Sequence, residues 1–327
     1  MTKIAFLVCS HTNPDQVARL VRLLSAHDGA SSVVVDHSEY DSHLDRGRLA
    51  RLPGVRILDR RHPVEWGDFS FIDIILGDVR WVMDNVDFDW LIVLSGQDYA
   101  IRPLPDIEAF LASTPYDGFV SGSPVESLKP RSAREARRRY YYRYFRVPGL
   151  PSVIARRLHA WASASGRTDA LSKRLTPVTV KALPDGSVVY VGFRRIRTPF
   201  TPAFPCYRGG FWITLSAKAV AAVDRFVQEN PKYVRYYRRT RVPDESFFNT
   251  ILLNDPTLNI CRDDRRYVRF PPHRSPRPDV LSIEDLEPML ASGKDFARKF
   301  DTRIDGAILD ALDERVHRIG VSVPEIT

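Results

Sequence analysis

The regular pattern of the chain starts with Lys3-Ile-Ala-Phe-Leu-Val-Cys9, a nearly unbroken apolar run. Such a run is typical of a strand that lies in a parallel sheet with both faces covered. Residues 14–25 follow with apolar side chains at helical spacing, so a helix is expected directly after the strand. The two segments predict the first strand and the first covering helix of an α/β domain.

The alternation of strands and helices continues outward from this pair. Strands are predicted at Ser32–Asp36, Val55–Leu58 and Trp90–Leu94, and a helix is predicted at 70–83. This order favours an α/β fold with a doubly wound, mostly parallel sheet flanked by helices. In such a sheet, the loops at the carboxyl ends of the strands bind the ligand.

The rest of the chain continues the α/β pattern around a basic insertion, residues 126–200, which is expected to form helices of its own. A length of 327 residues suits one large domain, and we expect a single domain over 1–327. Outside the insertion, helices are predicted at 103–112, 217–229 and 244–253, and strands at 118–121 and 266–270.

Positive charge is concentrated in one part of the chain. The net charge is +8, and residues 129–198 hold 17 basic and 3 acidic residues. Within them, residues 131–146 interleave tyrosines with arginines, a pattern that can grip phosphates and stack on bases. The same pattern also fits a solvated basic face or a surface for an anionic partner. We expect no nucleic acid partner.

The sequence gives no sign of a secreted or membrane-spanning protein. The three cysteines, Cys9, Cys206 and Cys261, are too far apart for a Cys-x-x-Cys metal site or a disulfide framework, so we expect them to be reduced. The apolar runs are of strand length, and residues 1–10 lack the features of a signal peptide. A cytoplasmic protein with no membrane span is therefore expected.

Four short segments carry more polar or aromatic residues than packing requires. Taken alone, each has an ordinary structural interpretation: a loop with a serine cap, a glycine turn, acids at a helix start, and cations at a helix end. They are Trp66-Gly-Asp-Phe-Ser70, Leu94-Ser-Gly-Gln-Asp-Tyr99, Val242-Pro-Asp-Glu-Ser-Phe-Phe-Asn-Thr-Ile251 and Phe296-Ala-Arg-Lys-Phe-Asp301.

Together with Gly210-Phe-Trp-Ile-Thr-Leu-Ser216, these segments follow the order of a known motif series. The series resembles that of the core-2/I-branching glycosyltransferases, which include branching N-acetylglucosaminyltransferases and peptide O-xylosyltransferases. The resemblance implies a GT-A-like fold and a nucleotide-sugar donor. It also implies inversion at the anomeric carbon by a single displacement, without a metal ion.

The resemblance assigns roles in catalysis and diphosphate binding. Glu245 matches the catalytic base, and Lys299 matches the lysine that binds the donor diphosphate. Arg298 stands beside that lysine. An upstream loop arginine is expected to assist, and both Arg274 and Arg277 stay open for this role.

The resemblance also assigns the nucleoside end of the donor. Asp36 matches an acid that reads the uracil edge, and His11 is expected to border the same pocket. Residues 1–125 would then form the nucleotide-binding half, and 201–327 the catalytic and diphosphate-binding half. The insertion between them could set acceptor specificity. Further donor-site or acceptor-site residues are expected at Trp66, Gly67, Asp98, Trp212 and Asp244.

No divalent metal cofactor is expected. A metal-dependent enzyme of the GT-A type would carry Asp-x-Asp directly after the central strand, where Ser95-Gly-Gln-Asp98 stands instead. Asp87-Phe-Asp89 has the required letters, but it precedes that strand, at the wrong edge of the sheet for a donor. Fixed arginine and lysine charges would then stabilise the leaving diphosphate.

The sequence therefore predicts an inverting, metal-independent glycosyltransferase that moves a sugar from a UDP-sugar to a hydroxyl of a carbohydrate or natural-product acceptor. A GlcNAc-type sugar is favoured over xylose, because xylosyltransferase-like members carry an acid beside the motif tryptophan, whereas Phe211 precedes Trp212 here. Two alternatives stay open: a catalytically inactive nucleotide-sugar-binding homologue, and a nucleic-acid-binding protein that uses the Arg/Tyr-rich segment.

Overall fold

A mostly parallel seven-stranded sheet forms the centre of the protein, in the strand order β13-β6-β12-β4-β1-β2-β3. Strand β1 pairs in parallel with β2 and β4, whereas β12 runs antiparallel to both of its neighbours. The expected α/β fold class is confirmed. The strands are β1 (Ile4–Ser10), β2 (Ser32–His37), β3 (Val55–Leu58), β4 (Trp90–Ser95), β6 (Gly118–Phe119), β12 (Thr214–Ser216) and β13 (Ile260–Cys261).

The structure is a computed structural model that describes residues 1–26, 31–39, 42–59, 64–65, 67–147, 157, 178–182, 189–271 and 278–317. Within these ranges, no helix is both long and apolar enough to cross a bilayer.

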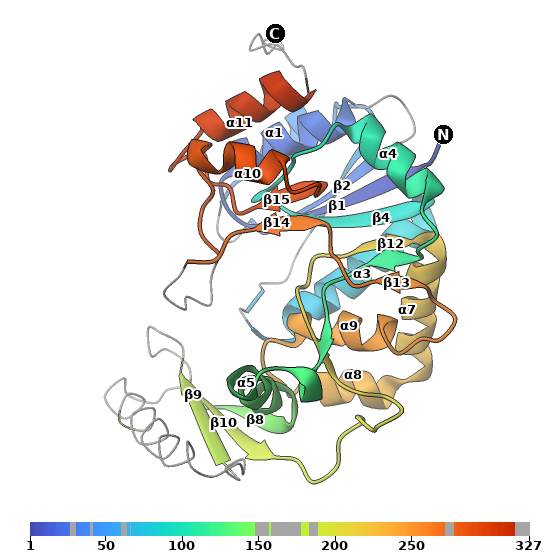
Figure 1. Ribbon diagram of the computed structural model, residues 1–327, viewed down its shortest axis with the longest axis vertical. Coiled ribbons are helices and arrows are strands. Elements are labelled where there is room, and N and C mark those ends of the chain that lie inside the picture. Colours follow the sequence, from blue (N-terminus) through green and yellow to red (C-terminus); the bar gives the residue numbers. More distant parts are fainter. Residues whose placement is uncertain are drawn as a thin grey trace.

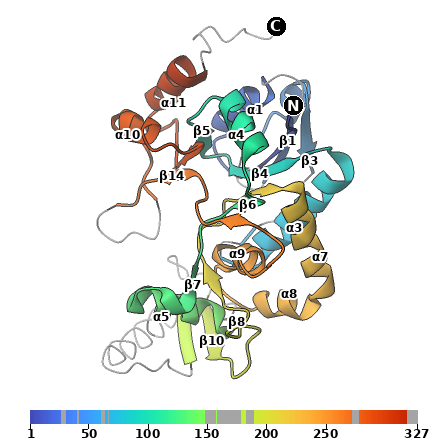
Figure 2. The same ribbon diagram turned by 45° about the vertical axis from the view of Figure 1, so that its right-hand side comes forward.

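Helices cover both faces of the sheet (Figures 1 and 2). One buried cluster packs Phe6 and Val8 of β1 against α1 (Pro14–Ser25), α4 (Leu104–Ser113), α10 (Leu286–Leu290) and α11 (Ala307–Leu312). A second cluster packs Ala5 and Leu7 against the opposite helices. These are α3 (Ser70–Asn85), α7 (Ala217–Glu229), α8 (Pro231–Tyr237) and α9 (Phe247–Leu252). Successive residues of a strand point to opposite faces, so the apolar run of β1 supplies both clusters.

A smaller sheet carries the carboxyl-terminal motif. Its strands are β14 (Arg266–Val268), β15 (Phe296–Arg298) and β5 (Asp98–Ala100), in the order β14-β15-β5. Strands β15 and β5 are antiparallel, with Arg298 directly opposite Asp98. The Phe296 motif is therefore a strand and not a helix end, and it brings the two halves of the chain together.

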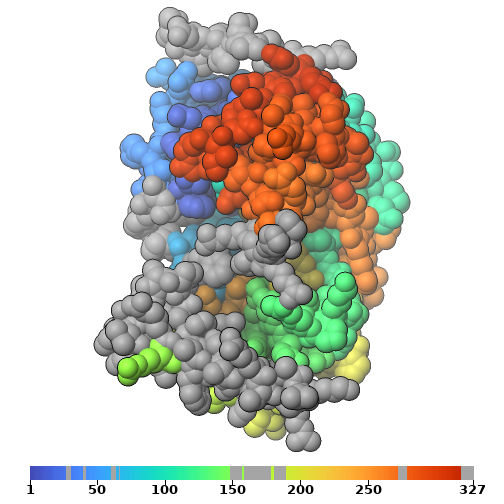
Figure 3. Space-filling view, turned by 60° about the vertical axis from the view of Figure 1, so that its left-hand side comes forward, coloured from blue at the N-terminus to red at the C-terminus, as the bar shows by residue number. Residues whose placement is uncertain are grey.

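The basic insertion differs from the expectation of helices alone. Its described part contains α5 (Pro130–Tyr140) and a three-stranded antiparallel sheet in the order β8-β10-β9. The strands are β8 (Tyr142–Val147), β9 (Val178–Ala182) and β10 (Val189–Arg194). Along β8 the tyrosines are buried and the arginines exposed, which is the period of a strand. In Figure 3, α5 (green) lies below the carboxyl-terminal elements (orange and red).

The predicted helix over 244–253 is interrupted. Residues Pro243–Glu245 form a short 3-10 turn, and α9 begins only at Phe247. The hydroxyl of Ser246, between them, donates to the carbonyl of Tyr207 at 2.7 Å. That contact holds the chain against the two-stranded ribbon of β7 (Ser123–Pro124) and β11 (Tyr207–Arg208). The remaining short elements are α2 (Arg46–Leu49), the 3-10 turns Val125–Ser127 and Ile283–Asp285, and a π-helical turn at Asp313–His317.

Candidate active site

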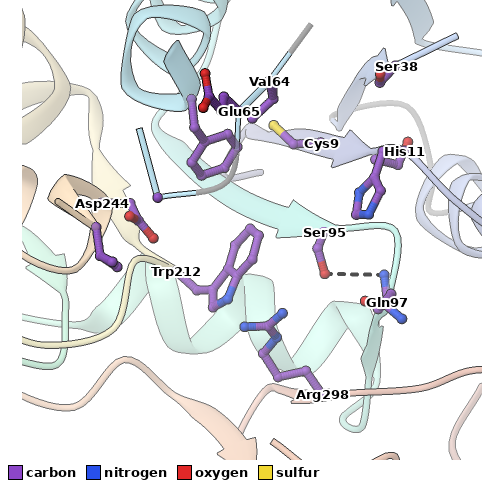
Figure 4. A pocket seen from close by; sticks show the side chains of 14 residues that line it. Cys9, His11, Ser38, Val64, Glu65, Ser95, Gln97, Trp212, Asp244 and Arg298 are labelled. Carbon is purple, nitrogen blue, oxygen red and sulfur yellow. Dashed lines mark hydrogen bonds between the residues drawn. The ribbon is translucent and has the colours of Figure 1, made fainter. Parts of the chain in front are cut away.

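A cavity of about 400 Å³ lies at the carboxyl ends of β1, β2 and β4, the edge where the sequence places the ligand loops (Figure 4). Both halves of the chain line it. One wall comes from Cys9, Ser10, His11, Ser38, Ser95 and Gln97. The other comes from Val64, Glu65, Gly67, Phe71, Trp212, Val242, Asp244 and Arg298.

A close approach between β1 and the turn after β4 lies next to the lining residues Ser10, Ser95 and Gln97. A Cβ atom on Gly96 would lie 2.8 Å from Cβ of Ser10 and 2.7 Å from Cγ2 of Val17. Glycine is therefore required at this position, because any side chain would push the two loops apart. The carbonyl of Gly96 accepts a hydrogen bond from Nε2 of Gln16 at 2.9 Å, which fixes the turn.

Arg298 reaches the cavity from β15. Its Nε atom lies 3.0 Å from Oδ1 of Asp98, and its guanidinium carbon lies 4.5 Å from the centre of the Trp212 ring. Figure 4 shows Trp212 between Arg298 and Asp244. The guanidinium is thus held between a carboxylate and an aromatic face, both favourable partners for a cation.

Asp98 has no exposed surface, so it supports Arg298 rather than facing a ligand. Its Oδ2 atom accepts a hydrogen bond from the amide of Ser95. The buried side chain of Arg266 also lies near Asp98. Burial lowers the pKa of Arg266, and the charge of Asp98 opposes that effect.

The second predicted diphosphate ligand has a different placement. Lys299 follows Arg298 directly but is not among the described residues that line the cavity. The pKa of Asp301 is lowered mainly by its hydrogen bond with Arg303, and the charge of Lys299 adds to this effect, so the lysine lies near Asp301. Arg274 and Arg277, the candidate loop arginines, lie outside the described residues, as does Trp66.

Of the two residues predicted to bind the nucleoside, one lines the cavity and the other does not. His11 lines the cavity in the loop after β1. Asp36 stands opposite Cys9 in the β1–β2 register and is 1% exposed, so it lies in the sheet behind the cavity wall. The cavity therefore brings together five of the predicted site residues: His11, Gly67, Trp212, Asp244 and Arg298.

Asp244 is the carboxylate of the Pro243 motif that lines the cavity. Removal from water raises its pKa to about 6, and the neighbouring charge of Glu245 acts in the same direction. A carboxylate with a pKa this close to neutrality can exchange a proton at physiological pH.

Glu245 lies beside the cavity-lining residues, and two arginines hold its Oε2 atom. Nη1 of Arg139 donates to it at 2.5 Å, and Nε of Arg208 donates to it at 3.3 Å. No described residue donates to Oε1, and the side chain is 31% exposed. The two arginines thus fix one oxygen of the carboxylate, and the described residues leave the other without a donor.

A further polar group, which sequence reasoning missed, ties the insertion to the cavity wall. The hydroxyl of Tyr190 on β10 donates to Oε1 of Glu65 at 2.5 Å, and Arg146 lies 3.3 Å from the other oxygen. The guanidinium of Arg241 stacks 3.8 Å from the centre of the Tyr190 ring. Glu65 stands directly before the predicted Trp66-Gly67 motif, which was the one local signal for it.

Within the described residues, no three His, Cys, Asp or Glu side chains are placed to hold a metal ion together. Asp87 and Asp89 contact Lys3 at the amino end of β1, the edge opposite the cavity.

The family described as "Core-2/I-Branching enzyme" matches residues 4–290. The chain is 24% identical to "Xylosyltransferase oxt" of Drosophila melanogaster, over 95% of this chain and 33% of that protein. It is 23% identical to "Xylosyltransferase 1" of Canis lupus familiaris, over 95% of this chain and 30% of that protein. The chain thus spans about a third of the length of these relatives.

Among solved structures, HddC from Yersinia pseudotuberculosis aligns with 67% of this chain and 79% of its own, at 12% identity and a TM-score of 0.28. A match this weak bears on neither the fold nor the function. The family match covers the Pro243 motif and every cavity-lining residue named above except Arg298, and it confirms the resemblance to this family. The chain belongs to the Core-2/I-Branching enzyme family.

Proposed function

We propose that this chain is an inverting, metal-independent glycosyltransferase that moves a sugar from a UDP-sugar to an acceptor hydroxyl. Membership of the family and the names of the relatives support glycosyl transfer. The observation that carries the proposal is that the guanidinium of Arg298 and the carboxylate of Asp244 line the same cavity.

The donor would lie along the carboxyl ends of β1 and β4, with its nucleoside toward His11 and its diphosphate toward Arg298. A charge-assisted hydrogen bond from Arg298 would strengthen as the diphosphate leaves. Lys299, together with Arg274 or Arg277, is proposed to add positive charge there. These fixed cations would take the place of a divalent ion.

Glu245 is the proposed base. The acceptor oxygen attacks C1 from the face opposite the nucleotide, and the bond from C1 to the diphosphate oxygen breaks, with its electron pair leaving on UDP. The acceptor proton passes to Oε1 of Glu245. Arg139 and Arg208 would hold the carboxylate in place. Asp244 is the competing base, because it lines the cavity and Glu245 does not.

Two donor sugars are proposed, on different grounds. Phe211 before Trp212 favours a GlcNAc-type sugar, as expected from the motif. The relatives are named xylosyltransferases, which favours xylose. The acceptor is proposed to be a carbohydrate or a natural product.

A thermal-shift series with UDP, UDP-GlcNAc and UDP-xylose in the presence of EDTA tests donor binding. A ligand at a hundredfold excess over its dissociation constant stabilises the folded state by about 2.7 kcal/mol. We expect UDP and one of the two UDP-sugars to raise the melting temperature. Absence of any shift would overturn the proposal. A shift without transfer or donor hydrolysis would identify an inactive homologue.

A further inference from the structure

The antiparallel sheet β8-β10-β9 has two chemically different faces. One face buries Tyr142, Tyr144 and Tyr190 in a small cluster of their own. The register places Phe145 and Val191 side by side on the other face, with Phe193 opposite Arg143. Val178 of β9 stands on the far side of Phe193. This second face, defined by these five residues, is called the outer face below.

The outer face exposes large apolar side chains to solvent. Phe145 is 37% exposed, Phe193 is 48% exposed and Val178 is 39% exposed. The two phenyl rings meet edge to face, with their centres 5.9 Å apart. Ile196, in the segment after β10, is fully exposed. Phe145, Phe193 and Val178 are neighbours on this face, and adjoining exposed apolar groups of this kind mark interaction surfaces.

Arginines lie beside the apolar side chains at Phe145. The guanidinium of Arg143 lies 5.1 Å from the centre of the Phe145 ring, and that of Arg239 lies 5.8 Å from it. Arg195 lies close to both, since its pKa, lowered mainly by burial, is lowered further by their charges. Among the described residues, no carboxylate lies within ion-pair distance of Arg143 or Arg239.

We propose that the outer face binds the surface of a bilayer that contains anionic lipids. The exposed phenylalanine and valine side chains of this face can enter the boundary between headgroups and acyl chains. The positive charges of Arg143 and Arg239 match the negative surface potential of such a bilayer. The protein would lie on the membrane without spanning it.

A nucleic acid fits the same face less well. In proteins that bind single-stranded nucleic acids, the bases stack on accessible aromatic rings. Here Arg143 and Arg239 already lie over the ring of Phe145. The ring of Phe193 contacts the ring of Phe145 in an edge-to-face arrangement. Val178 has no ring on which a base could stack. A bilayer uses all of these side chains, whereas a nucleic acid would use only the arginines.

The outer face is linked to the cavity through β10. Tyr190 lies on the buried side of the same strand that carries Phe193, and its hydroxyl contacts Glu65 in the cavity wall. A membrane bound at the outer face would therefore hold the cavity near the lipid surface. The proposal does not rest on the proposed transfer reaction, because binding is measured without substrate.

Co-sedimentation with vesicles tests the proposal on the full chain. We expect binding to vesicles of phosphatidylcholine with about 30 mol% phosphatidylglycerol, and little binding to phosphatidylcholine alone. Raising the salt concentration to about 0.5 M should weaken binding, because the charge contribution is screened. Equal binding to both vesicle types, or to neither, would overturn the proposal.

Paired variants separate the contributions of the two kinds of side chain. Phe145→Ala with Phe193→Ala, and separately Arg143→Gln with Arg239→Gln, should each lower the partition coefficient by roughly tenfold or more. The matched controls are Ile304→Ala, an exposed apolar residue elsewhere, and Arg225→Gln, an exposed arginine on α7. Both should bind as the parent does.

Melting curves confirm that each variant is folded, and the arginine pair keeps the test valid if the phenylalanine pair unfolds. Vesicle binding unchanged in the folded arginine pair, or tight binding to single-stranded RNA that the phenylalanine pair does not affect, would overturn the proposal.

Discussion

Nε of Arg298 lies 3.0 Å from Oδ1 of Asp98, directly across an antiparallel strand pair. The carboxylate is fully buried, while 18% of the arginine side chain is exposed at the cavity. The buried carboxylate of Asp98 therefore orients the guanidinium of Arg298 toward the cavity, where the diphosphate is proposed to bind. The ring of Trp212 limits its movement on the other side.

Replacing the buried partner should disturb both stability and binding. Asp98→Asn leaves Arg298 and the buried Arg266 without their shared anion, so we expect the free energy of unfolding to fall by about 3 kcal/mol. The dissociation constant for UDP should rise by roughly tenfold, because Arg298 is less well positioned. Urea unfolding and calorimetric titration measure the two effects. Asp87→Asn, in an exposed pair with Lys3, is the control and should change little.

Substitution of Glu245 and substitution of Asp244 are expected to differ in their effect on turnover. If Glu245 is the base, Glu245→Gln should keep UDP binding while turnover falls by on the order of 10²- to 10⁴-fold. Asp244→Asn should then have the smaller effect on turnover. Single-turnover rates for both variants decide between them. The reverse order would transfer the role of base to Asp244.

Arg139 is expected to act through Glu245. Arg139→Gln removes one of the two donors to Oε2, and we expect kcat to fall by about tenfold while KM for the donor is unchanged. Arg139→Lys should recover part of the loss, because it restores a charge but not the planar fork. Arg137→Gln, on the same helix and at 3.9 Å from Glu126, is the control. A lower melting temperature with parental kcat would show that Arg139 is only structural.

The raised pKa of Asp244 predicts a pH-dependent stability. Between its ordinary value of 3.8 and about 6, the unfolded chain loses this proton before the folded protein does. Stability from this group is therefore present at low pH and falls as the pH rises through that window. Asp244→Asn has no such loss and should be more stable than the parent above pH 6, by on the order of 1–3 kcal/mol. Unfolding at about pH 4.5 and pH 8 measures the difference, and a gain equal at both values would contradict the assignment.

Removal of divalent ions tests the role proposed for the fixed cations. We expect EDTA to leave transfer intact and added Mn²⁺ to raise the rate by less than about tenfold, roughly 1.4 kcal/mol of barrier. Fixed arginine and lysine charges already stabilise the leaving diphosphate in this proposal. Loss of activity on chelation, restored by Mn²⁺, would show that the cavity depends on a metal.

Elements set by local pattern were predictable from the sequence. Helix α1 has the predicted bounds, Pro14–Ser25, because proline favours its first turn and apolar residues recur at helical spacing. Strand β8 differs from the expectation that the insertion forms helices, although its tyrosines and arginines alternate with the period of a strand. The helix expected over 244–253 is interrupted at Ser246, whose φ of −140° lies outside the helical region and whose hydroxyl donates to the carbonyl of Tyr207. Such a long-range bond leaves no trace in the local pattern.

The site was predictable only in part, for a related reason. The motifs located His11, Trp212, Asp244 and Arg298, because each lies in a recognisable segment. The contact between Arg139 and Glu245 joins positions 106 residues apart. No spacing rule could select that arginine from the 16 other basic residues of the insertion. Tertiary structure alone shows which of them faces the carboxylate.

The bond from Arg139 to Glu245 also limits how this protein can be re-engineered. Helix α5 belongs to the insertion, so the segment that looks like an appendage in the sequence supplies part of the support for the proposed base. A chimera that exchanges the insertion for that of a relative would remove this support together with any acceptor preference. Such grafts should keep an arginine at this position of α5, and the segment is best treated as an integral part of the fold.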